Sequence, residues 1–309
     1  MTRRWQPTDE PGTRALNQPN QTGGIILFLS GVALMTAMDV TVKWLVTDDL
    51  HVVQLLFVRS IIIVAILLMF YLSRRKLSQL KPQRTTAQCI RGLIGFIAPF
   101  AFFTALKYLS LTAATVVFFS NIFFITFLSA LLLKERVGLY RWSAVFIGYI
   151  GVVIAIDPQA EGELFGYMMT LLSSATFAYL FISGKMLGNT ETSESLVLFY
   201  NLGVGMVAMV LMPLFWQPLS ITDIAGLLLL SSLAVVGQYC MTHAFAIADA
   251  SLLAPLNYSA LAMMVVFDWL IWQTIPGSHT VLGAVIVVLS GCIVIWRQQR
   301  TARMDKATG

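Results

Sequence analysis

The sequence predicts an all-α integral membrane protein with ten transmembrane helices, arranged as two inverted five-helix repeats. Of the 309 residues, 58% are hydrophobic and only 11% are charged. A soluble domain carries roughly a quarter charged residues, so this composition excludes an ordinary soluble globule. The distribution of basic residues among the loops then predicts the number of spans and their orientation.

Ten apolar runs approach the roughly 20 helical residues that cross a bilayer core. They are residues 23–46, 52–72, 87–106, 111–133, 140–156, 164–187, 195–214, 224–247, 251–272 and 281–296. The run 140–156 is short and is expected to stand nearly upright in the membrane. Barrel strands are not predicted, because such strands alternate in polarity and these runs do not.

The loops predict which side of the membrane each end occupies. Sixteen of the 20 lysines and arginines lie on one side of a ten-span arrangement, and the opposite side holds only Lys107. By the positive-inside rule, both termini are predicted to be cytoplasmic. We expect the protein to be an integral protein of the cytoplasmic (inner) membrane. Residues 1–22 form a polar tail and 297–309 a basic tail. Membrane topology explains the net charge of +5, so no nucleic-acid partner is predicted.

The first apolar run is not predicted to be a cleaved signal peptide. It begins at Gly23 after a polar leader and extends to Val46, and no small-residue cleavage site follows it. We therefore expect it to remain as a spanning helix.

The two halves of the chain, residues 23–156 and 163–296, resemble each other weakly. Phe-Val-Arg-Ser at 57–60 corresponds to Phe-Tyr-Asn-Leu at 199–202, and Lys43 corresponds to Lys185. A five-helix unit used twice must enter the membrane in opposite orientations, a recurrent arrangement in transporters. The alternative is compositional similarity between apolar segments.

Three charged residues fall inside the first two predicted spans. Asp39 and Lys43 lie four residues apart on one helix face, and Arg59 lies at a similar depth in the next span. A charge deep in the bilayer costs at least about 2.5 kcal/mol, so each needs a partner or a function. Arg59 or Lys43 is a candidate for binding an anionic substrate group, with Asp39 as partner or proton carrier. A structural ion pair that joins the helices is the alternative.

Asp268, in the ninth predicted span, is the second candidate for proton coupling or for pairing with a basic residue across the bundle. Trp269 and Trp272 beside it are typical of a membrane interface, and they favour a position at the water boundary.

Uncharged polar residues near the middle of the spans predict a central cavity. Pro99 and Pro255 each remove a helix hydrogen bond and permit a kink. Interhelical hydrogen bonding, worth only about 0.6 kcal/mol on average, is the alternative for any single residue. The predicted lining residues are Asn121, Asn257, Tyr258, Tyr200 and Asn201, with Tyr179 nearby.

Motifs of enzymes and metal proteins are missing from the sequence. It contains no phosphate-binding glycine loop, no HExxH and no GxSxG. Cys89, Cys240 and Cys292 are far apart and lack the spacing of ligands. No enzymatic activity, cofactor or metal is predicted.

Several motifs together resemble the EamA-type carriers of the drug/metabolite transporter superfamily. They are Met38-Asp39-Val40-Thr41-Val42-Lys43-Trp44-Leu45, Gln54 to Arg59, Arg91-Gly92-Leu93, residues 105–114, Leu133-Lys134-Glu135-Arg136-Val137, Gly148 with Gly151, and Ala254-Pro255-Leu256-Asn257-Tyr258. The resemblance implies ten helices in two inverted repeats, a central cavity and transport by alternating access. It also implies metabolites such as amino acids, nucleosides or cofactors as substrates, and frequent export. The second half departs from the pattern, because Gln273-Thr274-Ile275-Pro276 stands where the first half has Glu135.

The sequence thus predicts a secondary carrier for a small polar or amphipathic metabolite, amino-acid-like or cofactor-like, more often exported than imported. The protein is expected to be a monomer or homodimer in the lipid bilayer. A non-transporting scaffold or sensor and a facilitative pore are the rival hypotheses.

Overall fold

The computed structural model describes residues 21–134, 138–156, 163–188, 190–248 and 250–308, and the regular elements in these ranges are all helices. The helices of the first half are α1 (Gln21–Thr47), α2 (Val52–Ser73), η1 (Leu77–Leu80), α3 (Thr85–Gly95), α4 (Ile97–Ala105), α5 (Leu111–Phe118), α6 (Asn121–Leu132) and α7 (Leu139–Ala155). Those of the second half are α8 (Glu163–Leu187), α9 (Ser193–Phe215), α10 (Ile221–Ile247), α11 (Ala250–Leu253), η2 (Ala254–Tyr258), α12 (Ser259–Trp272) and α13 (Ser278–Thr308).

Seven helical stretches of the described chain are long and apolar enough to cross a membrane. They are residues 21–47, 52–73, 85–105, 111–132, 163–187, 193–215 and 221–245. Three shorter apolar helices, residues 145–155, 256–272 and 278–293, coincide with the remaining predicted spans. The structure is thus all-helical in its described part and combines seven candidate spans with three shorter apolar helices.

The third predicted span is two helices in the structure, because the chain breaks between α3 and α4 at Phe96. Pro99 has no N–H and cannot bond to the carbonyl of Gly95, four residues earlier. The break falls at the position where this hydrogen bond is lost. The kink predicted from Pro99 is therefore present.

Two further breaks interrupt the fourth and ninth predicted spans. The first separates α5 from α6 at Phe119 and Ser120. The second is the 3-10 segment η2, which has Pro255 in its first turn and leads into α12. The interruption that Pro255 predicts is confirmed, whereas the break in the fourth span has no proline and was not predicted.

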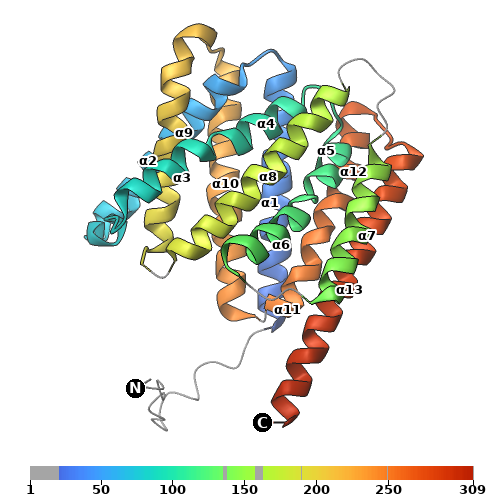
Figure 1. Cartoon of the computed structure of the whole chain (residues 1–309). Helices are drawn as coiled ribbons and strands as arrows, with labels where there is room; N and C mark the ends of the chain where they lie inside the picture. Colours follow the sequence, from blue (N-terminus) through green and yellow to red (C-terminus); the bar gives the residue numbers. More distant parts are fainter. Residues whose placement is uncertain (1–20, 135–137, 157–162, 189, 249, 309) are drawn as a thin grey trace.

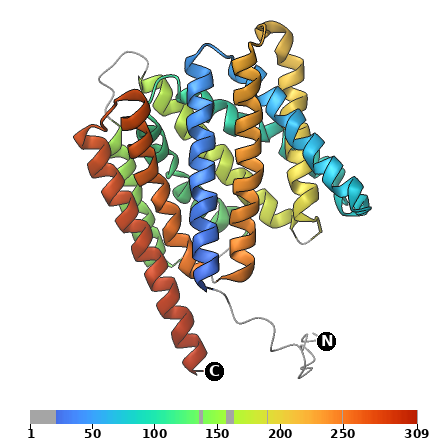
Figure 2. The same cartoon turned by 180° about the vertical axis from the view of Figure 1, so that it is seen from behind.

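The helices pack as a bundle in which α3, α4 and α8 run obliquely across α1 and α10, and α1 begins and α13 ends at the same end (Figures 1 and 2). We call the opposite end, which holds the loops 48–51, 106–110 and 273–277, the far end. The closest neighbours are α1 with α10, α7 with α13, α2 with α9, and α4 with α8. Gly92 of α3 and Gly203 of α9 let two backbones meet, since a Cβ on Gly203 would lie 2.3 Å from the Gly92 carbonyl carbon.

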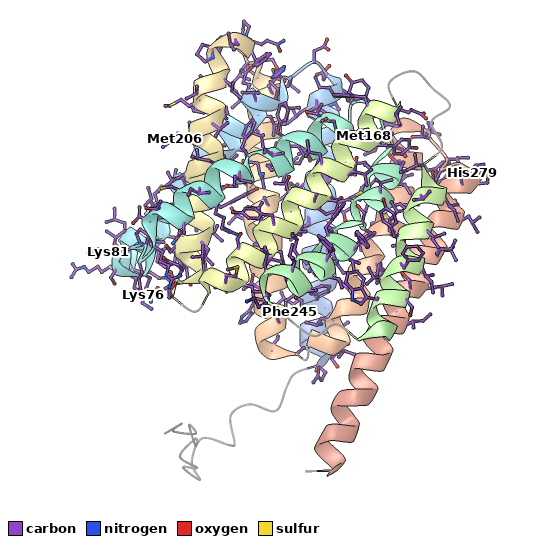
Figure 3. All side chains as sticks on the ribbon, in the orientation of Figure 1. Lys76, Lys81, Met168, Met206, Phe245 and His279 are labelled. Atoms are coloured by element: carbon purple, nitrogen blue, oxygen red, sulfur yellow. The ribbon has the colours of Figure 1, made fainter. Side chains whose placement is uncertain are left out.

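The last helix extends further than the sequence analysis predicted. A basic tail was expected from residue 297, yet α13 continues as a helix to Thr308 and projects beyond the bundle (Figure 1). Apolar side chains such as those of Met168, Met206 and Phe245 lie on the outside of the bundle (Figure 3), and each is about half exposed. Such a surface suits contact with lipid.

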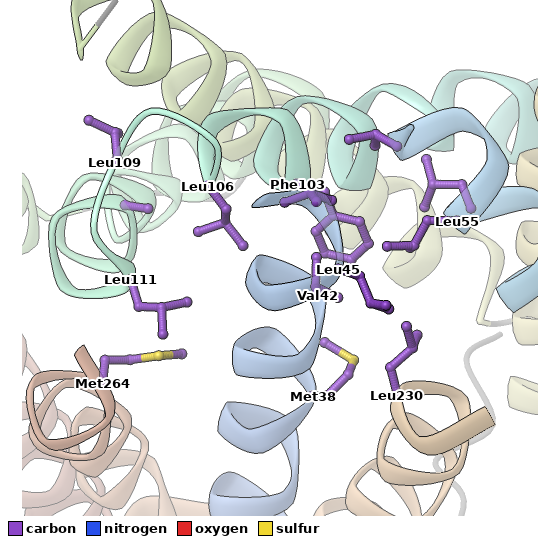
Figure 4. Close-up of a cluster of buried hydrophobic side chains, with 14 of the residues drawn as sticks. Met38, Val42, Leu45, Leu55, Phe103, Leu106, Leu109, Leu111, Leu230 and Met264 are labelled. Atoms are coloured by element: carbon purple, nitrogen blue, oxygen red, sulfur yellow. The ribbon is translucent and has the colours of Figure 1, made fainter. Parts of the chain in front are cut away.

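The main hydrophobic core lies toward the far end. Many of its buried side chains come from the second half of α1, the first turns of α2 and α5, and the end of α4, and helices α7 to α10, α12 and α13 contribute others. Val42, Leu45, Phe103, Leu106 and Leu111 meet there around α1 (Figure 4). A smaller core around Phe28, Val32 and Leu253 lies between the start of α1, the end of α10 and α11.

Candidate functional site

A cavity of about 650 Å³ lies at the middle of the bundle. Residues 32–39 of α1, 118–123 at the α5–α6 break and 257–264 at the η2–α12 junction contribute to its wall, as do α2, α4, α7, α8, α9, α10 and α13. Both halves of the chain therefore build it. The volume falls within the roughly 300–1,000 Å³ typical of small-molecule sites.

Asp39 and Arg59 are the charged residues among the described residues that line the cavity. Their charges interact, but within the described chain neither side chain forms a hydrogen bond or a direct ion pair. The Arg59 guanidinium carbon lies 5.8 Å from the centre of the Phe103 ring, and its Nε is buried without a partner. The cavity thus holds two opposite charges that do not pair directly.

Four of the uncharged polar residues predicted for the cavity line it: Asn121, Tyr200, Asn257 and Tyr258. Asn121 begins α6, directly after the break. Tyr258 ends η2, and its ring lies 5.3 Å from that of Phe119. The two helix breaks therefore bring polar and aromatic groups to the same wall.

Much of the remaining wall is aromatic. The rings of Phe102 and Phe118 are 5.1 Å apart, and those of Phe118 and Phe177 are 5.4 Å apart. Phe123 and Tyr149 add a pair at 5.0 Å. The sequence analysis missed these phenylalanines, because a phenylalanine in an apolar span gives no signal that separates a cavity wall from a lipid-facing surface.

Two serines of α8 hold the interrupted helices in place. The hydroxyl of Ser173 donates to the carbonyl of Ala98 in α4, at 2.8 Å. The hydroxyl of Ser174 donates to the carbonyl of Phe118 at the end of α5, at 3.1 Å. The break after α5 leaves the Phe118 carbonyl without its usual donor, since the Ile122 N–H bonds to Phe119 instead, and a side chain can satisfy such a group. Both serines therefore stabilise the cavity wall.

Lys43 and Asp268 lie outside the cavity and pair with each other. The Lys43 Nζ is 3.3 Å from Asp268 Oδ1, and both side chains are buried. The structure therefore does not contain the Asp39–Lys43 pair considered from the sequence, because Lys43 contacts a carboxylate of the second half instead. It also corrects the interface position favoured for Asp268, whose exposure is only 1%.

Two other predicted residues also lie away from the cavity. Asn201 donates from Nδ2 to the carbonyl of Val197, one turn earlier in α9. Arg91, part of the Arg91-Gly92-Leu93 motif, donates to the carbonyls of Leu180 and Leu196 at 3.3 and 3.4 Å. Glu135 is outside the described residues. Within the described ranges no group of three potential metal ligands gathers.

The bundle and its central cavity define the class of protein, an integral membrane protein with a small-molecule-sized cavity among its helices. A profile of the EamA-like transporter family matches residues 22–156 and again residues 164–296. The chain therefore belongs to the EamA-like transporter family, and its spans place it in the membrane.

Named relatives extend over most of the chain. The S-adenosylmethionine uptake transporter of Rickettsia conorii is 28% identical over 277 residues, which are 90% of this chain and 94% of that protein. The pseudopaline exporter CntI of Pseudomonas aeruginosa is 25% identical over 90% of this chain and 97% of its own length. The riboflavin transporter of Vibrio cholerae is 26% identical over 59% of this chain and 62% of that protein.

A solved crystal structure shares the fold, with a TM-score of 0.63 and 15% identity, covering 91% of this chain and 99% of the other. The relatives' names support a metabolite transporter for this chain and are consistent with a protein that is not an enzyme.

Proposed function

We propose that this protein is a secondary carrier that moves a small amphipathic metabolite with a zwitterionic part across the cytoplasmic membrane by alternating access. The observation that carries the proposal is the pair of opposite charges, Asp39 and Arg59, which face one central cavity without a direct ion pair or hydrogen bond to the described residues. Charges at this depth are costly, so a ligand that pairs with both would compensate them.

A zwitterion suits this arrangement. The guanidinium of Arg59 can donate two parallel hydrogen bonds to a carboxylate, which makes it the stronger binding group for the anionic part. The carboxylate of Asp39 is the acceptor for an ammonium or another cationic group. Asn121, Asn257, Tyr200 and Tyr258 supply uncharged hydrogen bonds around the rest of the ligand.

The aromatic walls indicate a ligand with an organic body beyond its charged part. Phenylalanine and tyrosine rings bind cationic and flat organic groups through their faces. The proteins named after S-adenosylmethionine, riboflavin and pseudopaline show that relatives are assigned to ligands of this general kind. We therefore keep amino-acid-like and cofactor-like metabolites as the proposed substrate class.

Ten spans in two inverted repeats, residues 23–156 and 163–296, are part of the proposal. The helix neighbours support this arrangement, because α1 packs on α10 as α8 packs on α4. Likewise α3 packs on α9 as α10 packs on α2, and the pairs α2–α9 and α7–α13 join equivalent helices. Such reciprocal packing is expected when two repeats are related by a pseudo-two-fold axis.

We retain Asp39 as the candidate for proton coupling and export as the proposed direction, with both termini cytoplasmic. Asp268 is a weaker candidate for carrying protons, because both of its oxygens accept hydrogen bonds from α5. Lys43 and Asn201 drop out of the proposed substrate contacts, since neither lines the cavity. A monomer or homodimer suits the proposal equally.

The test compares metabolites in cells and medium by untargeted mass spectrometry. Cells express the wild-type protein, Arg59→Ala, Asp39→Asn, or no added protein, with membrane levels matched. Arg74→Ala is the matched control, because Arg74 is an exposed arginine at the end of the same helix. We expect a metabolite to redistribute with the wild type and the control but with neither cavity variant.

Reconstitution in liposomes separates the rival functions. A carrier exchanges external labelled metabolite for internal unlabelled metabolite, whereas a pore shows no such counterflow. S-adenosylmethionine, riboflavin and methionine are the first probes. A scaffold or sensor would show no redistribution in cells and would tolerate Arg59→Ala, and that result would refute the proposed function.

A further inference from the structure

Asp268 stands at the centre of a buried cluster that joins three helices. Its Oδ1 accepts a hydrogen bond from the backbone N–H of Leu111 at 3.0 Å and from Lys43 Nζ at 3.3 Å. Its Oδ2 accepts from the backbone N–H and the hydroxyl of Thr112, both at 2.8 Å. We call Lys43, Leu111, Thr112 and Asp268 the Asp268 cluster.

The Asp268 cluster lies one helical turn beyond the cavity on every helix that contributes to it. Asp39 lines the cavity four residues before Lys43 on α1, and Met264 lines it four residues before Asp268 on α12. On α5, Thr115 lines the cavity three residues after Thr112. One turn of helix is about 5.4 Å, so the cluster forms the layer between the cavity and the far end.

Further side chains close the far end above this layer. The Lys43 Nζ lies 4.5 Å from the centre of the Trp272 ring, which covers the ammonium group. Trp272 packs against the main core, to which Leu45 and Leu106 (Figure 4) belong. The backbone carbonyl of Asp268 also accepts from the N–H and the hydroxyl of Thr274, at 3.1 and 3.2 Å, which fixes the end of α12.

The contacts of the cluster cross the two halves of the chain. Lys43, Leu111 and Thr112 belong to the first half and Asp268 to the second. A buried ion pair is no more stabilising than well-packed apolar side chains, but it fixes one geometry and is costly when only one partner is lost. Partly separated helices would lose the Lys43–Asp268 pair, so the pair favours either a fully closed or a fully open far end over intermediate arrangements.

We propose that the Asp268 cluster is the gate at the far end of the cavity, and that the Lys43–Asp268 pair and the contacts with α5 must separate before the cavity can open to that side. The proposal rests on the proposed carrier function, because alternating access requires the cavity to open to the far end. Opening would separate α12 from α1 and from the first turn of α5.

The test measures access to the cavity from the far side by chemical labelling. Cys89, Cys240 and Cys292 are replaced by serine, and Met35→Cys introduces one thiol on the cavity wall. Membrane vesicles of both orientations are treated with a membrane-impermeant maleimide, and the labelling rate is followed. We expect Lys43→Met and Asp268→Asn to raise labelling from the far side by about tenfold, because weakening the closed state by about 1.4 kcal/mol shifts its population tenfold.

Matched variants keep the test decisive. Lys107→Met removes an exposed lysine at the same end and should leave the labelling rate unchanged. Thr112→Val keeps the shape of the side chain, removes one donor and should raise the rate by a smaller factor, even if the charge variants fail to fold. A gel-filtration profile checks folding.

Unchanged labelling in Lys43→Met, Asp268→Asn and Thr112→Val would overturn the proposal, and so would an equal rise from both sides of the membrane, which indicates general loosening. Labelling requires no substrate. Increased labelling from the far side without detectable transport would show that the cluster closes the far end, although the carrier function had failed. Transport without any change in labelling would overturn the gate and leave the carrier function intact.

Discussion

Removing the acid and removing the base of the Lys43–Asp268 pair are expected to affect stability unequally. Asp268→Leu leaves the buried Lys43 ammonium without its anion and leaves the α5 donors at Leu111 and Thr112 without their acceptor. Loss of one partner of a buried pair costs about 3–5 kcal/mol, and each unpaired donor adds about 1–3 kcal/mol. Lys43→Met leaves the carboxylate with its donors from α5, so we expect a loss of only about 1–3 kcal/mol.

The double variant provides the sharper measurement. Lys43→Met combined with Asp268→Leu has no orphaned charge, so it should be more stable than Asp268→Leu alone. The assay is unfolding of the purified protein in mixed micelles with increasing dodecyl sulfate, followed by circular dichroism, with Lys107→Met as control. Strictly additive losses would show that the two residues are not coupled and would refute this account of the pair.

Three other perturbations act elsewhere in the structure. Gly291→Ala should lower the melting temperature of the purified protein and Tyr258→Ala in the same chain should restore part of it, because a Cβ at residue 291 would overlap the Tyr258 hydroxyl. Equal melting temperatures for the single and the double variant would contradict this. Glu191→Gln should speed amide hydrogen exchange at the start of α3, because the Glu191 carboxylate accepts the N–H of Gln83, just before that helix, at 2.9 Å. Unchanged exchange would mean that this contact does not stabilise the start of the helix. Burial, and secondarily the nearby Lys107, lowers the pKa of His51 below its usual 6.5. The stability against unfolding should therefore fall as the pH drops below about 6.5 toward the lower folded-state pKa. In a pH series of melting temperatures, His51→Gln should reduce this fall.

The apolar spans were predictable from the sequence because each satisfies its own backbone hydrogen bonds. The predicted run 52–72 corresponds to α2 at Val52–Ser73, and the run 164–187 to α8 at Glu163–Leu187. The interruptions near Pro99 and Pro255 were predictable for the same local reason, since proline lacks an N–H. The break at Phe119 and Ser120 has no such signal, and packing against Ser174 of α8 accompanies it.

The candidate site was predictable in part. Asp39, Arg59, Asn121 and Tyr258 were singled out because polar groups in apolar spans require an explanation, and the structure places all four at the cavity. The same reasoning also selected Asn201, which bonds within its own helix. Polarity shows that a residue needs a partner, but it does not show whether that partner is a ligand, a carbonyl or another side chain.

Taken alone, the sequence determined the class of protein, its apolar spans and the residues that are costly to bury, because hydrophobicity and backbone hydrogen bonding act over short stretches of chain. Only the tertiary structure decided which acidic side chain pairs with which basic side chain. Lys43 lies four residues from Asp39 in the chain, yet its anion is Asp268, 225 residues away. That choice depends on how α12 and the first turn of α5 pack against α1, and contacts between distant segments leave no periodic pattern in the sequence.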